Sequence, residues 1–183
     1  IQIRKLIHRV GRIKSGNGKN GRYLLQILRL THYGQPVHSL QDQIHDQKIR
    51  AEFLAAVYGS AAPYIDEYLE TVYKAVVDCG SHLYCFNHPD KPWHKMELVE
   101  RCEEIFENAK RVAANEEILY RIKFQEMAVR YLRILLTPKG SEERNRLIDE
   151  FTPDMKAFGI TMLWERANAD VCLAILKGEQ EPG

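Results

Sequence analysis

The sequence lacks any apolar run long enough to cross a membrane. Of its 183 residues, 45% are hydrophobic and 28% are charged. No stretch approaches the roughly 20 uninterrupted apolar residues that a membrane helix needs. A chain of this length can bury about two-thirds of its unfolded surface in a core. The sequence therefore predicts a globular domain and no membrane partner.

Cysteine is scarce, with four residues in the whole chain: Cys79, Cys85, Cys102 and Cys172. Dense disulfides are typical of small domains that cannot build a sufficient core, and this chain is long enough not to need them. We therefore expect mostly reduced, partly buried thiols.

Acidic residues are absent from positions 1–41, which hold eight of the 26 lysines and arginines. The rest of the chain holds the other 18 basic residues and all 25 acidic ones, a net charge of −7. This change of composition predicts two segments. Residues 1–43 are expected to form a poorly ordered basic extension, and residues 44–183 a helical domain.

Apolar residues recur at helical spacing through most of residues 44–183, which predicts an all-α fold of five to six helices in an irregular bundle. The first helix is expected at 44–58, with Gly59 at its end and Ser60 capping the next. The apolar positions of that second helix form one wide face: Tyr64, Ile65, Tyr68, Leu69, Val72, Tyr73, Val76 and Val77.

Three further helices are predicted between 96 and 151. The first spans 96–114 and turns Val99, Phe106 and Val112 inward. The second spans 116–136 and can be capped by Asn115, and it sits centrally because its second half is apolar on most sides. The third starts after Ser141 and breaks or kinks at Pro153. An extended linker at 160–163 and a final helix at 165–177 complete the domain.

Two groups of side chains in the loop at 79–94 are candidates for binding. Cys79, His82, Cys85 and His88 are zinc-ligand types, but a strict three-residue repeat in one short stretch cannot easily wrap a tetrahedral ion, so no metal or other cofactor is expected. Aromatic rings of the loop could stack on sugar or pin the loop to its own core. The carbohydrate-contact candidates are Tyr84, Phe86, Trp93 and His94.

Carboxylates offer no catalytic set by sequence alone. Glu165 and Asp170, or the group Glu103, Glu104 and Glu107, could serve as an acid–base pair, but a solvated charged face is the simpler interpretation. No catalytic residue is therefore assigned. The basic extension could contact phosphates, but the rest of the chain is acidic and the extension has few aromatic residues, so nucleic-acid binding is the alternative and not the prediction.

Several motifs occur together in a fixed order. Phe53 to Tyr68 read FLAAVYGSAAPYIDEY, followed by Trp93 with the helix at 97–114. Arg121-Ile122-Lys123-Phe124 then leads to Tyr131-Leu132, and Phe158-Gly159-Ile160-Thr161 is followed by Leu163 and Glu165. Through these motifs residues 48–177 resemble the C-terminal part of bacterial domain-of-unknown-function family 4838, whose long members resemble α-glucuronidase-type glycoside hydrolases.

The resemblance implies a non-catalytic helical C-terminal domain that packs against the catalytic barrel of a longer, periplasmic or extracellular protein. The barrel would lie against the helices at 64–77 and 116–136, and polysaccharide would be bound only through the parent protein. Residues 1–46 depart from the family pattern, since a basic segment replaces the expected apolar helix, and a shifted reading frame would explain both features. A stand-alone helical interaction module that uses the basic extension is the alternative.

Overall fold

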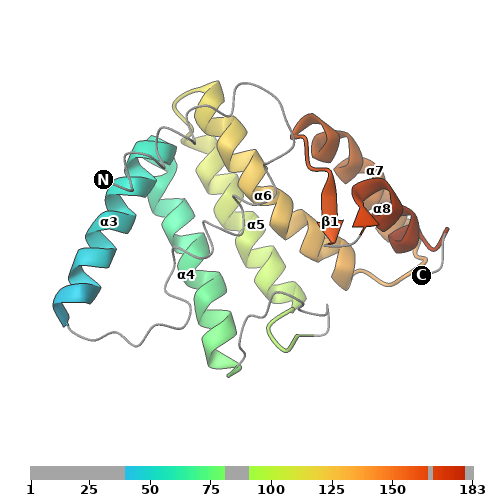
Figure 1. Cartoon of the computed structure of the whole chain (residues 1–183), viewed down its shortest axis with the longest axis horizontal. Coiled ribbons are helices and arrows are strands. Elements are labelled where there is room, and N and C mark those ends of the chain that lie inside the picture. The colour runs from blue at the N-terminus through green and yellow to red at the C-terminus, as the bar shows by residue number, and fades with distance from the viewer. Residues whose placement is uncertain (1–39, 81–90, 165–166, 180–183) are drawn as a thin grey trace.

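The computed structural model describes residues 40–80, 91–164 and 167–179 (Figure 1). The described helices are α3 (Leu40–Tyr58), α4 (Ala62–Asp78), α5 (Met96–Arg111), α6 (Glu116–Leu136), α7 (Glu142–Ala157) and α8 (Ala169–Lys177). A short 3₁₀ helix, η1 (Gly59–Ala61), joins α3 to α4. The strands β1 (Met162–Trp164) and β2 (Ala167–Asn168) form an antiparallel hairpin. The predicted all-α bundle is confirmed.

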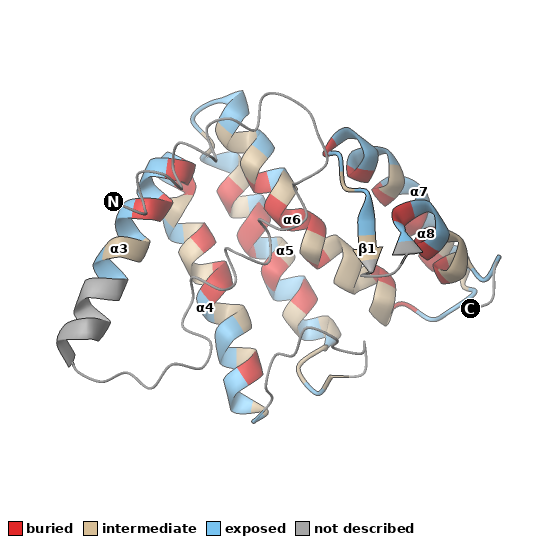
Figure 2. Cartoon of the chain, in the orientation of Figure 1, coloured by how far each residue is buried: buried red, intermediate tan, exposed pale blue. Residues whose placement is uncertain are grey.

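The helices follow one another across the molecule in chain order. Figure 1 shows α3, α4, α5 and α6 side by side, with α7, the hairpin and α8 beyond α6. Buried residues lie along the facing sides of these helices (Figure 2). Helix α6 lies between α3, α4 and α5 on one side and α7, the hairpin and α8 on the other. Its predicted central position is therefore confirmed. Within the described residues, no helix combines the length and the apolar composition that spanning a bilayer requires.

The junction between α3 and α4 depends on Gly59. Its φ is +53°, and a Cβ placed there would lie 3.1 Å from Cδ1 of Ile118 in α6. Glycine therefore suits both the left-handed backbone and the close approach of α6. Ser60 does not cap α4 as the sequence predicted, because its hydroxyl donates instead to the carbonyl of Val112 at 2.5 Å. It ties the junction to the end of α5.

The predicted N-terminal caps of α6 and α7 are confirmed. The side chain of Asn115 accepts a hydrogen bond from the Ile118 amide at 2.9 Å, and that of Ser141 accepts one from the Arg144 amide at 3.1 Å. These bonds satisfy amides that have no partner within the helix. Both helices therefore begin where their polar residues predicted.

Several predicted boundaries were wrong. Helix α3 begins at Leu40, so residues 40–43 of the predicted extension are helical, whereas residues 1–39 lie outside the described part. Helix α7 does not break at Pro153 but continues to Ala157. The segment at 160–163 leads into a hairpin strand, because its partner follows within a few residues, and α8 begins only at Ala169.

The predicted apolar face of α4 is only partly buried. Ile65, Tyr68, Leu69 and Val76 are buried, whereas Tyr73 is 37% exposed and Val77 is 51% exposed. Val112, expected inside, is exposed past the end of α5. The ring of Tyr68 lies 4.8 Å from that of Phe106 in α5, measured between centroids, so Tyr68 anchors the packing of α4 on α5.

Replacing Tyr68 by alanine should lower the free energy of unfolding by about 3 kcal/mol, because a buried aromatic ring is lost and leaves a cavity. Tyr73→Ala on the same helix is the matched control and should cost less than about 1 kcal/mol, since its ring is far more exposed. Denaturant unfolding measures both. Equal losses from the two variants would place Tyr68 outside the core.

Candidate functional site

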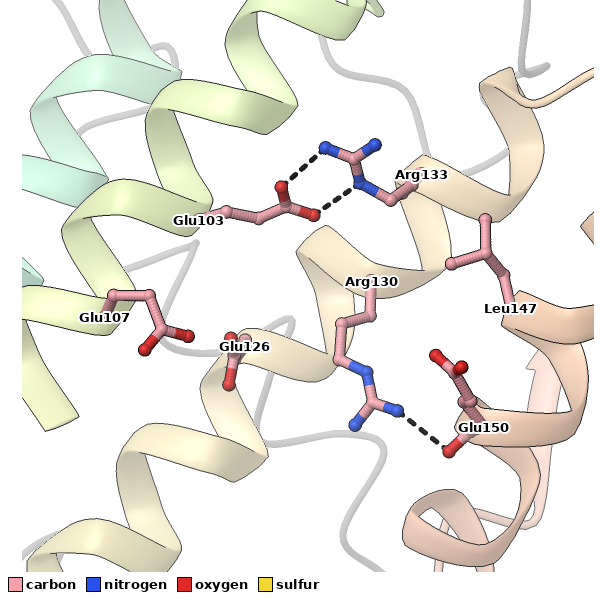
Figure 3. Close-up of a pocket in the computed structure, with 7 residues that line it drawn as sticks. All are labelled: Glu103, Glu107, Glu126, Arg130, Arg133, Leu147 and Glu150. Atoms are coloured by element: carbon pink, nitrogen blue, oxygen red, sulfur yellow. Dashed lines mark hydrogen bonds and ion pairs between the residues drawn. The ribbon is translucent and has the colours of Figure 1, made fainter. Parts of the chain in front are cut away.

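A charged cleft of about 360 Å³ lies between α5, α6 and α7 (Figure 3). Helix α6 forms its floor, with α5 on one side and α7 on the other. Nearly all of its lining residues carry a charge: Glu103, Glu107, Glu126, Arg130, Arg133, Leu147 and Glu150. The cleft is therefore a polar site between three packed helices.

Arg133 joins α6 to α5 at one end of the cleft. Its Nε donates to Oε1 of Glu103 and its Nη2 donates to Oε2, each at 2.5 Å. This two-point contact matches the planar guanidinium to the carboxylate. The hydrogen bond to Glu103 raises the pKa of Arg133 above its already high ordinary value, against the opposing effect of burial. Arg133 is thus a permanent cation here.

Lys110 makes the second link between α5 and α6. Its Nζ donates to both carboxylate oxygens of Glu126, at 2.9 and 3.2 Å, and pairs with Glu107 at 2.5 Å. The Glu126 side chain is only 12% exposed. Burial, the largest single effect, lowers the pKa of Lys110, but the hydrogen bonds and charges of Glu107 and Glu126 together raise it above its ordinary value. The buried carboxylate is therefore neutralised by a charged ammonium group.

Arg130 joins α6 to α7 on the other side of the cleft. Its Nη1 donates to Oδ2 of Asp154 at 2.5 Å, and its Nη2 donates to the backbone carbonyl of Glu150 at 2.9 Å. Its guanidinium carbon also lies 5.8 Å from the centre of the Phe151 ring, within cation–π range. One side chain therefore contacts α7 through charge, backbone and ring.

The carboxylates of the cleft are engaged by cations. Glu103 accepts from Arg133, Glu107 and Glu126 pair with Lys110, and Glu150 accepts from Arg146 at 2.7 Å. A general acid must instead carry a proton toward the reacting atom. No group of three or more His, Cys, Asp or Glu residues in the described part is arranged to hold a metal ion. The ion pairs of these carboxylates link α6 to α5 or lie within α5 or α7.

The predicted carbohydrate-contact residues are not part of this cleft. Tyr84 and Phe86 lie outside the described residues. Trp93 and His94 precede α5, where their rings meet edge-on with centroids 4.0 Å apart and both side chains are half-buried. The Trp93 ring nitrogen is buried and has no hydrogen-bond partner among the described residues. The contact of Trp93 with His94 agrees with rings that pack locally, and their role toward sugar stays a prediction.

The other candidates are distributed as follows. Cys79 donates through its thiol to the Val76 carbonyl at 3.2 Å, whereas His82, Cys85 and His88 lie outside the described residues. Glu103 and Glu107 line the cleft, and Glu104 pairs with Arg101 at 2.5 Å. Asp170 is exposed and 3.4 Å from Lys156. Glu165 and the basic extension up to residue 39, on which the nucleic-acid alternative rests, lie outside the described part.

Sequence reasoning missed the α6 side of the cleft. Glu126, Arg130 and Arg133 are spaced by four and three residues, which places them on one stripe of a helix. A charged stripe in the apolar half of α6 was the available signal, because a helix buried on all sides would not keep three charges.

Comparison of the chain with models of protein families, with curated proteins and with solved structures found no match.

Replacing Lys110 by methionine should lower the free energy of unfolding by about 2 kcal/mol, because it leaves the Glu126 carboxylate buried without a partner. Adding Glu126→Met should restore most of this loss, since the unpaired charge is removed too. Lys123→Met on the exposed side of α6 is the control and should be nearly neutral. A double variant no more stable than Lys110→Met would contradict this role.

The stabilisation by Lys110 should also depend on pH with a defined sign. Its pKa is raised in the folded protein, so the contribution is complete below the ordinary lysine value of about 10.4 and is lost as pH rises through the folded value. The difference in stability between wild type and Lys110→Met should therefore stay level from neutral pH to about pH 9 and shrink above about pH 10.4.

Proposed function

We propose that the chain is a non-catalytic helical C-terminal domain of a glycoside-hydrolase-like protein, and that it packs against the catalytic barrel of that protein. The observation that carries this proposal is the pairing of the cleft carboxylates. Glycoside hydrolysis in most families needs two carboxyl groups about 5–10 Å apart across a bound sugar, one of them able to give up a proton. Here Glu103 and Glu126 accept hydrogen bonds from Arg133 and Lys110.

The motif resemblance at residues 48–177 supplies the identity of the partner in this proposal. Its motifs fall on residues that build the bundle. Phe53 and Tyr68 are buried in the core of α3 to α6, and Phe158 is buried beside α6. The motifs therefore belong to the packing of the helices and not to a catalytic centre. That distribution supports the proposed structural role.

The exposed part of α4 is the surface that fits a neighbouring domain. Val77 is 51% exposed at a position where the apolar repeat of α4 continues beyond its buried part. An isolated exposed valine is ordinary. Val77, however, lies on the helix against which the resemblance places the barrel, so we assign it to the interface.

The test compares this chain with the longer protein encoded by the upstream reading frame. Val77→Ser should change the unfolding free energy of the isolated chain by less than about 0.5 kcal/mol, and should cost about 1 kcal/mol or more in the longer protein. Met162→Ser, at a comparably exposed apolar residue of the hairpin, is the control and should be neutral in both. A neutral Val77→Ser in the longer protein would reject this surface.

The isolated chain should also hydrolyse none of a panel of aryl glycosides and uronides. Turnover that is abolished by Glu126→Gln or Glu103→Gln would reject the non-catalytic assignment, because it would show that the cleft carries out chemistry. The longer protein is assayed with the same panel. Turnover by the longer protein shows that the panel contains a suitable substrate, so that the lack of turnover by the isolated chain can be attributed to the domain itself.

A further inference from the structure

The described residues form two apolar cores that share α6. The first core joins α3, η1, α4 and α5 to Ile122 and Val129 of α6. The second joins α7, Phe158 and α8 to Met127 and Ile134 of α6. Fifteen buried residues make up the first core and nine the second. Because burial of apolar area is the main source of stability, we expect the first core to be the more stable of the two.

The elements beyond α6 are tied to one another. We define the C-terminal unit as α7, the hairpin and α8. Lys177 of α8 pairs with Asp149 of α7 at 2.6 Å, and the Ala169 amide donates to the Thr161 carbonyl at 2.9 Å. Phe151 and Leu173 belong to the same buried cluster. The C-terminal unit therefore has internal contacts that survive if it separates from α6.

Its contact with α6 combines aromatic rings with the buried Met127 and Ile134, and it is bordered by the cleft. Aromatic rings of α6 contact rings beyond it. Phe124 lies 5.5 Å from Phe158, and Tyr131 lies 6.2 Å from Phe151, measured between ring centroids. Arg130 provides the ion pair across this contact. On the cleft side, α5 and α7 stand apart with charged side chains between them, so no apolar contact has to break there (Figure 3).

We propose that the C-terminal unit opens away from α6 as one piece while the first core stays folded. Opening breaks the aromatic row, the buried contacts of Met127 and Ile134 and the contacts of Arg130. The chain crosses between the two cores at residues 137–141. Sub-global openings of this kind follow supersecondary units with few contacts to the rest of a protein. The opened state exposes the apolar face of α6 around Met127 and Ile134, a surface that the closed state hides.

The C-terminal unit and the first core each contain a buried thiol. Cys172 of α8 is fully buried in the C-terminal unit, and Cys102 of α5 is buried in the first core. A buried thiol reacts with a water-soluble disulfide reagent only when its surroundings open. Cys79→Ser and Cys85→Ser remove the other two thiols, and peptide mapping by mass spectrometry assigns the modified site.

Under native conditions Cys172 should be modified at least about tenfold faster than Cys102, because the C-terminal unit opens without global unfolding. Arg130→Met should raise the Cys172 rate about fivefold or more and leave Cys102 unchanged, since it removes a charge-assisted contact to α7. Arg146→Met is the matched control, because the ion pair of Arg146 with Glu150 lies within α7, and it should change neither rate. Equal rates for both thiols would overturn the proposal.

Hydrogen exchange of the unmodified chain keeps the test independent of the variants. Amides of α7 and α8 should exchange together, and before those of α5, at neutral pH. Exchange of α5, α7 and α8 at one common rate set by global unfolding would show a single cooperative unit and reject the proposal. Exchange of α8 alone, with α7 still protected, would reject opening as one piece.

Discussion

Helix α6 must satisfy two apolar cores at once, and the rest of the structure depends on this constraint. Ile122 and Val129 face the packing of α3, α4 and α5, whereas Met127 and Ile134 face α7 and α8. A helix can present two apolar faces only if its remaining sides are narrow. The polar residues of α6 are therefore confined to stripes between the cores, and the helices on either side are positioned by which face they cover.

The charged cleft is a consequence of the same arrangement. Glu126, Arg130 and Arg133 lie on the α6 stripe between the two apolar faces, and charges placed there need partners because they are partly removed from water. Lys110 and Glu103 on α5 and Asp154 on α7 provide them. These pairs join α6 to α5 and to α7, in agreement with the proposed structural role.

The proposed interface and the proposed opening involve different cores. The first core packs α4 on α5 through Tyr68 and Phe106, and it presents the exposed end of α4 to a neighbouring domain in the proposed assembly. The second core depends on one face of α6 and on Arg130. In both proposals, the first core stays folded and carries the interface, and the C-terminal unit is attached to it less strongly.

The sequence by itself determined the helices, most of their ends and most of the core. Apolar periodicity identified Ile65, Val99 and Phe106, while Asn115, Ser141 and Gly59 marked boundaries through short-range hydrogen bonds and backbone angles. Only the tertiary structure decided which apolar residues of α4 stay exposed, that Ser60 bonds to the end of α5, and that Lys110 meets Glu126. These depend on contacts between residues far apart in the chain, and helical spacing specifies a face without specifying what covers it.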